Sequence, residues 1–172
     1  MRAEEIAAEI LRQLGKNSIE AIYRDKILTQ RTRQYEIGAQ SKNSTVEILH
    51  TLLGIELKIA NRRLLCPDLA TARYLAVFAR LGCDRVALPY DISRISRIAD
   101  ELESSWHRLM LLADHLTADR SARLRARVRR RLLDDQREKV GSLGAGARFP
   151  RFNQKTRQRP DPSPSAKKKR KF

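Results

Sequence analysis

Apolar residues recur every three to four positions along the first part of the chain, which predicts helices. Ile6, Ile10 and Leu14 share one face of a helix over residues 3–14. Ser18 suits the start of a second helix, which we expect to end near residue 28 with its isoleucines turned inward. The chain therefore opens with two amphipathic helices.

The spacing changes to alternation in the segment 54–60, where Ile55, Leu57 and Ile59 alternate with polar residues. This period of two predicts a half-buried strand. The apolar segment before it, 45–53, fits a strand or part of a helix. Two further short strands are expected, one near Tyr35–Ile37 and one in the sequence RRLLC at 62–66.

Helical spacing returns after this group of strands. A helix should begin at Pro67 and Asp68 and end at Gly82, where a left-handed cap would stand. The sequence RVALPY at 85–90 reads as a short buried strand, and Asp91 caps a long helix that follows it.

The long helix carries an apolar seam that alternates steps of four and three, close to that of a coiled coil. We expect the seam to be buried against the body, or to pair with a second copy or a partner helix across 95–116. Trp106 is expected to anchor it. The seam consists of Ile95, Ala99, Leu102, Trp106, Leu109, Ala113 and Leu116.

Together these elements predict an α/β protein with a small mixed sheet flanked by helices. Long C-terminal helices and a disordered basic tail should follow the sheet. We divide the chain into an α/β body with the long helix (1–116), an arginine-rich helix (117–140) and the tail (141–172). The tail holds three of the seven glycines and four of the six prolines, a composition that cannot bury a core.

Charge is distributed very unevenly along the chain. Residues 1–119 hold 17 basic and 16 acidic side chains, a net of +1, whereas residues 120–172 hold 19 basic and 4 acidic, a net of +15. Such asymmetry favours a polyanionic partner, above all nucleic acid, either DNA or RNA.

The arginine-rich helix is the first candidate surface for that partner. Leu124, Val128 and Leu132 form a narrow apolar stripe by which the helix can dock on the body. A second face carries arginines, and Arg125 and Arg129 flank it. Acids that could neutralise the run locally are nearly absent before Asp134. Guanidinium groups bind phosphates in bidentate geometry. The predicted phosphate-binding face consists of Arg120, Arg123, Arg127, Arg130 and Arg131.

The tail is the second candidate surface. Phe149 and Phe152 lie among basic residues, a pattern that allows base stacking beside phosphate pairing, although docking of both rings on the body is an alternative. The final basic cluster would also read as a nuclear-import signal in a eukaryote. The tail residues assigned to nucleic acid are Arg148, Arg151, Lys155, Lys167, Lys168, Lys169, Arg170 and Lys171.

Several other classes of protein find no support in the sequence. No apolar run approaches the roughly 18 residues of a membrane span, and the acidic N-terminus does not resemble a secretory signal. We therefore expect no membrane partner and a cytoplasmic location, or a nuclear one in a eukaryote. Cys66 and Cys83 are expected to be buried thiols. The three histidines form no ligand cluster.

One tripeptide suggests a catalytic activity. Glu56 and Lys58 form an E-x-K on the predicted strand, and residues 1–95 resemble in element order the core of the PD-(D/E)xK nucleases, particularly the Holliday-junction-resolvase-like branch. The resemblance implies that Glu56 helps to hold Mg²⁺ or Mn²⁺ and that Lys58 positions water or stabilises charge. Glu47 is the second metal-ligand candidate; Glu36, Glu20 and Glu9 are further carboxylate candidates.

Three hypotheses follow from the sequence. The main one is a nucleic-acid-binding protein that grips the phosphate backbone through the arginine-rich helix and the basic tail, with no cofactor. The second is a metal-dependent endonuclease, for which a cluster of carboxylates around Glu56 would be required. The third is an assembly component of an RNA-rich complex, which would leave the seam around Trp106 exposed. Whether the protein is an enzyme is left open by the sequence.

Overall fold

The computed structural model describes residues 1–38 and 45–146. The helical elements, in chain order, are α1 (Ala3–Leu14), the 3₁₀ turn η1 (Gly15–Asn17), α2 (Ile19–Ile22), the π turn η2 (Tyr23–Ile27), α3 (Leu69–Leu81), α4 (Ile92–Leu116) and α5 (Ala122–Leu143). The strands are β1 (Thr32–Glu36), β2 (Val46–Thr51), β3 (Gly54–Ile59), β4 (Arg62–Cys66) and β5 (Arg85–Pro89). The segment expected to be strand or helix is therefore strand β2.

The strands form two small antiparallel sheets, in place of the single mixed sheet that the sequence analysis expected. One sheet pairs β1 with β5, and the other has the order β2-β3-β4. The reason lies in the connections. Turns of two residues join β2 to β3 and β3 to β4, and such short connections allow only antiparallel neighbours. The α/β class itself, with long C-terminal helices, is confirmed.

Helix α3 lies at the centre of the molecule, and its ends are those that the sequence predicts. The Asp68 side chain accepts a hydrogen bond from the backbone N–H of Thr71 at 2.7 Å, and Gly82 closes the helix at φ 86°. Most of the helix is buried, with Tyr74 and Phe78 fully so. It packs against one face of the three-stranded sheet and against α4, which makes it the middle layer of the main core.

A second core lies between α1, α4 and α5. Ile10, Leu109 and Leu132 are almost completely inaccessible there, and Ala113 and Val128 pack with them. Helix α5 is thus part of the packed body. The seam of α4 is buried within the chain, as expected, and the described residues leave no open apolar stripe along it for a partner helix.

Trp106 differs from expectation. It is only half-buried, at the edge of the main core, and the Arg80 guanidinium lies 5.9 Å from the centre of its ring. Ile98 and Ser105, which are not part of the predicted seam, are buried beside it. The Ser105 hydroxyl donates a hydrogen bond to the Asn17 carbonyl at 2.5 Å. The indole therefore contributes a cation–π contact as well as packing.

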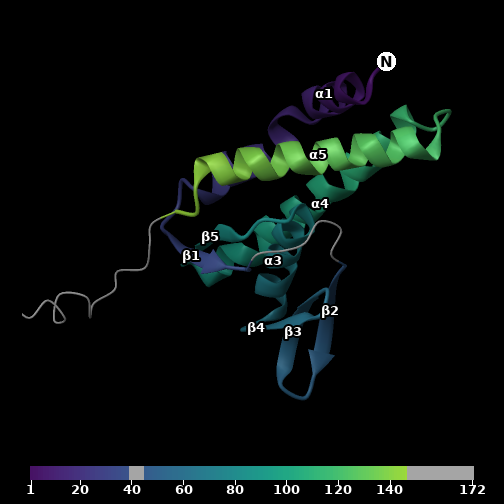
Figure 1. The fold of residues 1–172 in the computed structure, drawn as a ribbon. Coiled ribbons are helices and arrows are strands. Elements are labelled where there is room, and N and C mark those ends of the chain that lie inside the picture. Colours follow the sequence, from purple (N-terminus) through teal and green to yellow (C-terminus); the bar gives the residue numbers. More distant parts are fainter. Residues whose placement is uncertain (39–44, 147–172) are drawn as a thin grey trace, which may run out of the picture.

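Helix α5 and the three-stranded sheet lie at opposite ends of the molecule, with α3 between them (Figure 1). Helix α1 runs beside α5, and the β2–β3 hairpin projects away from the helices (Figure 1). The arginine-rich helix and the E-x-K strand consequently belong to separate surfaces. The disorder predicted for the tail concerns residues that, from 147 on, lie outside the described part of the chain.

Candidate nucleic-acid interface

The start of α5 is capped by Ser121, whose Oγ accepts a hydrogen bond from the backbone N–H of Leu124 at 3.3 Å. The sequence analysis began this helix at residue 117, but Thr117 is buried and its hydroxyl donates to the carbonyl of Ala113 in α4. Thr117 thus serves the end of α4 instead, and the four residues after it form the turn between the two helices.

The predicted apolar stripe of α5 is the face that docks on the body. Val128 and Leu132 are fully buried, Leu124 is half-buried, and the stripe continues through Gln136 and Val140 to the end of the helix. Because residues four apart on an α-helix follow one another with a small rotation, this stripe fixes which side of α5 faces solvent.

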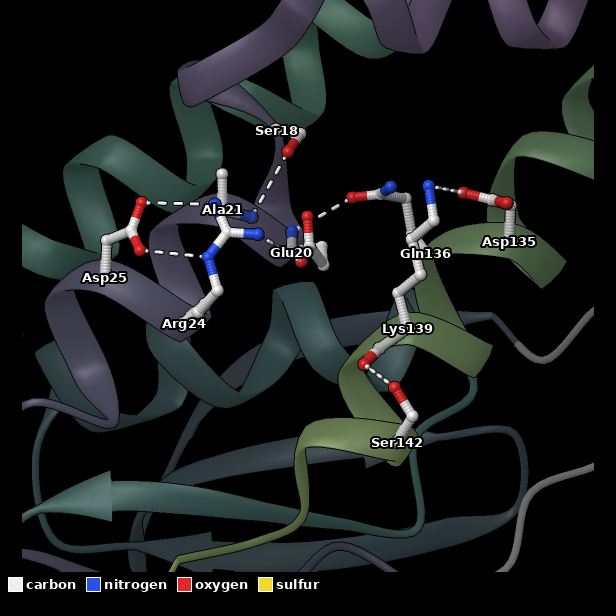
Figure 2. Close-up of polar contacts among 9 residues, drawn as sticks. All are labelled: Ser18, Glu20, Ala21, Arg24, Asp25, Asp135, Gln136, Lys139 and Ser142. Atoms are coloured by element: carbon white, nitrogen blue, oxygen red, sulfur yellow. Dashed lines mark hydrogen bonds and ion pairs between the residues drawn. The ribbon is translucent and has the colours of Figure 1, made fainter.

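Polar contacts hold the second half of α5 against the N-terminal helices. The buried Gln136 side chain accepts a hydrogen bond from the backbone N–H of Glu20 at 3.0 Å (Figure 2). The Tyr23 hydroxyl donates to the carbonyl of Gly144 at 2.5 Å and accepts from the N–H of Ala87 at 3.0 Å. Burial raises the pKa of Tyr23 to about 12, so the hydroxyl keeps its proton at neutral pH.

Exposed arginines lie along the first half of α5 and in the turn before it. All five residues of the predicted phosphate-binding face are exposed: Arg120, Arg123, Arg127, Arg130 and Arg131. None of them forms an ion pair with a carboxylate in the described part of the chain. Their positive charges are therefore available to an external anion. We call these five residues the arginine face.

One arginine beside this face is partly neutralised by a residue that local spacing could not reveal. Arg129 forms an ion pair with Asp114, which comes from α4 across the helix–helix turn. Toward the end of α5, Arg137 pairs with Asp134 at 2.8 Å and Lys139 with Asp135 at 3.0 Å (the latter pair in Figure 2). The uncompensated charge is thus concentrated in the first half of α5.

The tail residues assigned to nucleic acid, from Arg148 to Lys171, lie outside the described residues. Only the starting point of the tail is placed: the C-terminal turn of α5 ends beside β1 and β5, where Gly146 comes close to Thr32 and Ala87. The contribution of the tail to an interface therefore remains a prediction from its composition.

Glu56 and Lys58 project from the same face of β3, as two residues separated by one always do in a strand. Glu56 lies opposite Leu49 of β2 and Leu65 of β4 in the register, and only 8% of its side chain is exposed. Arg63 of β4 reaches across to it, with 3.4 Å between Nη1 and Oε2. The buried carboxylate thus has a cation as its partner.

The other carboxylates proposed as metal ligands do not gather around Glu56. Glu47 lies opposite Lys58, diagonal to Glu56, and cross-strand diagonal neighbours are about 7–8 Å apart. Glu20 and Glu36 pair with Arg24 and Arg85 on other elements. Within residues 1–38 and 45–146, no group of three or more histidine, cysteine, aspartate or glutamate side chains could hold a metal ion.

Glu9, the last of those candidates, is engaged within α1. Its carboxylate accepts hydrogen bonds from Arg12 at 2.6 and 2.9 Å and from Gln13 at 2.8 Å. The Arg12 hydrogen bonds are the main reason why the pKa of Glu9 falls to about 2.

A cleft of about 630 Å³ opens beside the C-terminal turn of α5, lined among others by Gln34, Cys83, Arg85 and Arg137. Burial raises the pKa of Cys83 to about 12, so its thiol stays protonated near neutral pH and is a poor nucleophile. Cys66 is also buried, and no disulfide joins the two, in agreement with the sequence analysis.

The helices of the described residues include none with both the length and the apolarity needed to cross a bilayer. Comparison of the chain with known protein families, with curated proteins and with solved structures gave no match in any of the three. The physical character of the surfaces described above is therefore the basis for a functional conclusion.

Proposed function

We propose that this protein binds nucleic acid, and that the arginine face of α5 and the basic tail hold the phosphate backbone. The observation that carries the proposal is the set of five exposed arginines, which have no ionic partner among the described residues. Four of them stand on a helix fixed to the body, and Arg120 lies in the turn before it. Five unpaired positive charges that repel one another on one surface lower stability unless a ligand compensates them.

The geometry of α5 suits a phosphate backbone. Because a helix rises about 1.5 Å per residue, Arg123 and Arg131 are about 12 Å apart along the axis, a span that covers successive phosphates of one strand. Arginine forms bidentate hydrogen bonds with phosphate oxygens, and such contacts set affinity and position without reading base sequence. The proposal therefore describes binding with little sequence preference.

The same surface explains why the docking side of α5 is narrow. A stripe of one buried residue per turn docks the helix on the body, and it leaves most of the circumference for charged side chains. Gln136 and the Tyr23–Gly144 contact add polar anchors at the far end, so the arginines in the first half are presented by a rigid support. Little conformational entropy of the backbone is then lost on binding.

The salt dependence of binding tests the proposal. Equilibrium binding to a labelled duplex and a labelled single strand would be measured by fluorescence anisotropy over a series of salt concentrations. Replacing Arg123, Arg127, Arg130 and Arg131 together by Gln should flatten the slope of log K against log salt by about three units, because each lost phosphate contact removes 0.7–0.9. Circular dichroism would verify that α5 still forms.

A matched control removes the same charge elsewhere. Replacing Lys16, Arg94, Arg97 and Arg108 by Gln also lowers the net charge by four, but these exposed side chains lie on η1 and α4. The slope should change by less than about one unit. An equal effect of both quadruple variants would show that total charge, and not the arginine face, determines binding, and an unchanged slope in the α5 variant would refute the proposal.

The tail is tested by a cut after Gly146, which preserves the buried Val140 and the Tyr23–Gly144 hydrogen bond. Removing residues 147–172 takes away 10 of the 19 basic side chains after residue 119. Affinity should fall and the salt slope should flatten further, while the thermal unfolding of the body is retained. Unaltered affinity would assign binding to the helix alone.

A further inference from the structure

The outer face of the three-stranded sheet, turned away from α3, has an unusual composition. In the register of the sheet, residues directly opposite one another share a face. The outer face therefore carries Glu47 and Leu49 from β2, Glu56 and Lys58 from β3, and Arg63 and Leu65 from β4. The leucines of this face belong to neither hydrophobic core, whereas Leu57 and Ile59 on the other face pack against α3.

Large apolar side chains are exposed on and beside this face. Leu65 is 57% exposed, and the turn of the β2–β3 hairpin exposes Leu52 and Leu53 completely or nearly so. Single exposed leucines are common, but a group on one projecting element is typical of a surface that contacts another protein. Figure 1 shows that the hairpin extends beyond the helices, so nothing in the described fold approaches its tip.

The charges on the face indicate which kind of partner it fits. Two acids, Glu47 and Glu56, and two bases, Lys58 and Arg63, give it a net charge of zero. The carboxylates of this face would repel a polyanion, whereas the arginine face would attract one. Glu47 and Lys58 form no ion pair among the described residues, so each sign has an unused charge for an outside partner.

We propose that this face binds a second copy of the chain. With a two-fold axis along β3, β2 of one copy lies over β4 of the other. Glu47 then faces Arg63 of the second copy, Leu49 faces Leu65 of the second copy, and the symmetry repeats both contacts. The arrangement pairs opposite charges between the outer strands and covers Leu65 with Leu49 of the second copy, so the outer strands are complementary to one another.

The side chains of β3, which lie on the two-fold axis, can be accommodated in this packing. Glu56 and Lys58 are two residues apart on β3, and packed sheets cross at an angle of about 30°. The two-fold axis keeps Glu56 and Lys58 level with their own symmetry mates, and the crossing angle moves these mates apart sideways. Glu56 also keeps Arg63 of its own sheet beside it, at 3.4 Å, so neither carboxylate meets its symmetry mate without a cation nearby.

The size of the face sets the strength of the contact. Three strands of about six residues cover roughly 20 Å by 15 Å, or about 300 Å². Stable interfaces bury about 800 Å² on each partner. The dimer is therefore weak and reversible, and sedimentation velocity over a range of protein concentrations, without nucleic acid, is the suitable measurement. The average mass should rise from 19.8 kDa toward twice that value with concentration.

Charge reversal tests the pairing itself. Glu47→Arg alone places like charges opposite one another, as does Arg63→Glu alone, and each should raise the dimer dissociation constant by roughly tenfold or more. An equimolar mixture of the two variants should dimerise again, because the new arginine of one meets the new glutamate of the other. Glu138→Arg, on α5, is the matched control and should leave the wild-type value. Thermal unfolding would establish that every variant is folded.

An uncharged pair of variants gives an independent test. Leu65→Ser should weaken the dimer several-fold, and Leu111→Ser should not, although Leu111 on α4 is 67% exposed. A monomer mass at every concentration would overturn the proposal. So would a dimer that all variants retain, or a mixture of charge-reversed variants that stays monomeric.

Discussion

The arginine face of α5 and the outer face of the three-stranded sheet both present charged side chains to solvent, yet they differ in the sign of those charges. The arginine face holds five cations without a carboxylate partner in the described chain. The sheet face alternates acids, bases and leucines, and its most buried acid, Glu56, is paired with Arg63. The two surfaces lie at opposite ends of the fold (Figure 1).

From this difference we expect the sign pattern of a surface, and not its number of charges, to decide which kind of partner it binds. A surface of one sign attracts a polyanion over a distance and loses that attraction as salt rises. A surface of mixed sign has almost no long-range field, and its charges act only in contact, where they select a matching arrangement. The first pattern fits nucleic acid, and the second fits a protein surface.

The largest difference between the two regions should appear in stability. Leu132 on the inner side of α5 is fully buried, so Leu132→Ala should lower the free energy of unfolding by about 2–5 kcal/mol through lost burial and a cavity. Leu65→Ala on the sheet face should change it by no more than about 0.5 kcal/mol. Urea unfolding of both variants would measure this. Similar losses would mean that the sheet face is covered within the monomer.

A smaller effect concerns Asp114, the acid that neutralises Arg129. Asp114→Asn should release one more guanidinium to phosphate, and the slope of log K against log salt should steepen by about 0.7–0.9 units. Glu47→Gln removes the same charge from the sheet face and serves as the control, for which we expect no change in slope. Anisotropy titrations at low protein concentration would compare them. A steeper slope in both would show that the two surfaces act as one electrostatic unit.

The smallest expected effect is the response to Mg²⁺. Two carboxylates that shared a metal would repel one another without it, so binding would raise the melting temperature. We expect no change, because the Arg63 guanidinium lies beside Glu56 and opposes a second cation there. Differential scanning fluorimetry with and without Mg²⁺ or Mn²⁺ measures this. A rise in melting temperature that Glu56→Gln abolished would support the nuclease hypothesis instead.

Local chemistry predicted much of the fold. The caps at Asp68 and Asp91, the end of α3 at Gly82 and the alternation in β3 all depend on a few neighbouring residues, and each stands where the sequence analysis expected it. The apolar stripe of α5 could also be predicted locally, because helical periodicity alone determines which residues share a face.

The same distinction between features of one element and contacts between elements applies to the candidate sites. The sequence alone showed that Arg123, Arg127 and Arg130 share a face and that Glu56 and Lys58 share another, since both follow from the period of a single element. It could not show that Asp114 meets Arg129 or that Arg63 covers Glu56. Each of those contacts joins two elements, and no pattern within one element encodes the distance between them.

The sequence by itself thus determined most of the elements, several of their ends, the charge asymmetry and the faces of the helices and strands, because these depend on backbone periodicity and on neighbours within one turn. Tertiary structure alone decided that the strands form two separate sheets, that Trp106 is half-buried, and that the arginine face and the E-x-K strand point to opposite ends. The physical reason is that packing of remote apolar surfaces selects among many arrangements of the same elements.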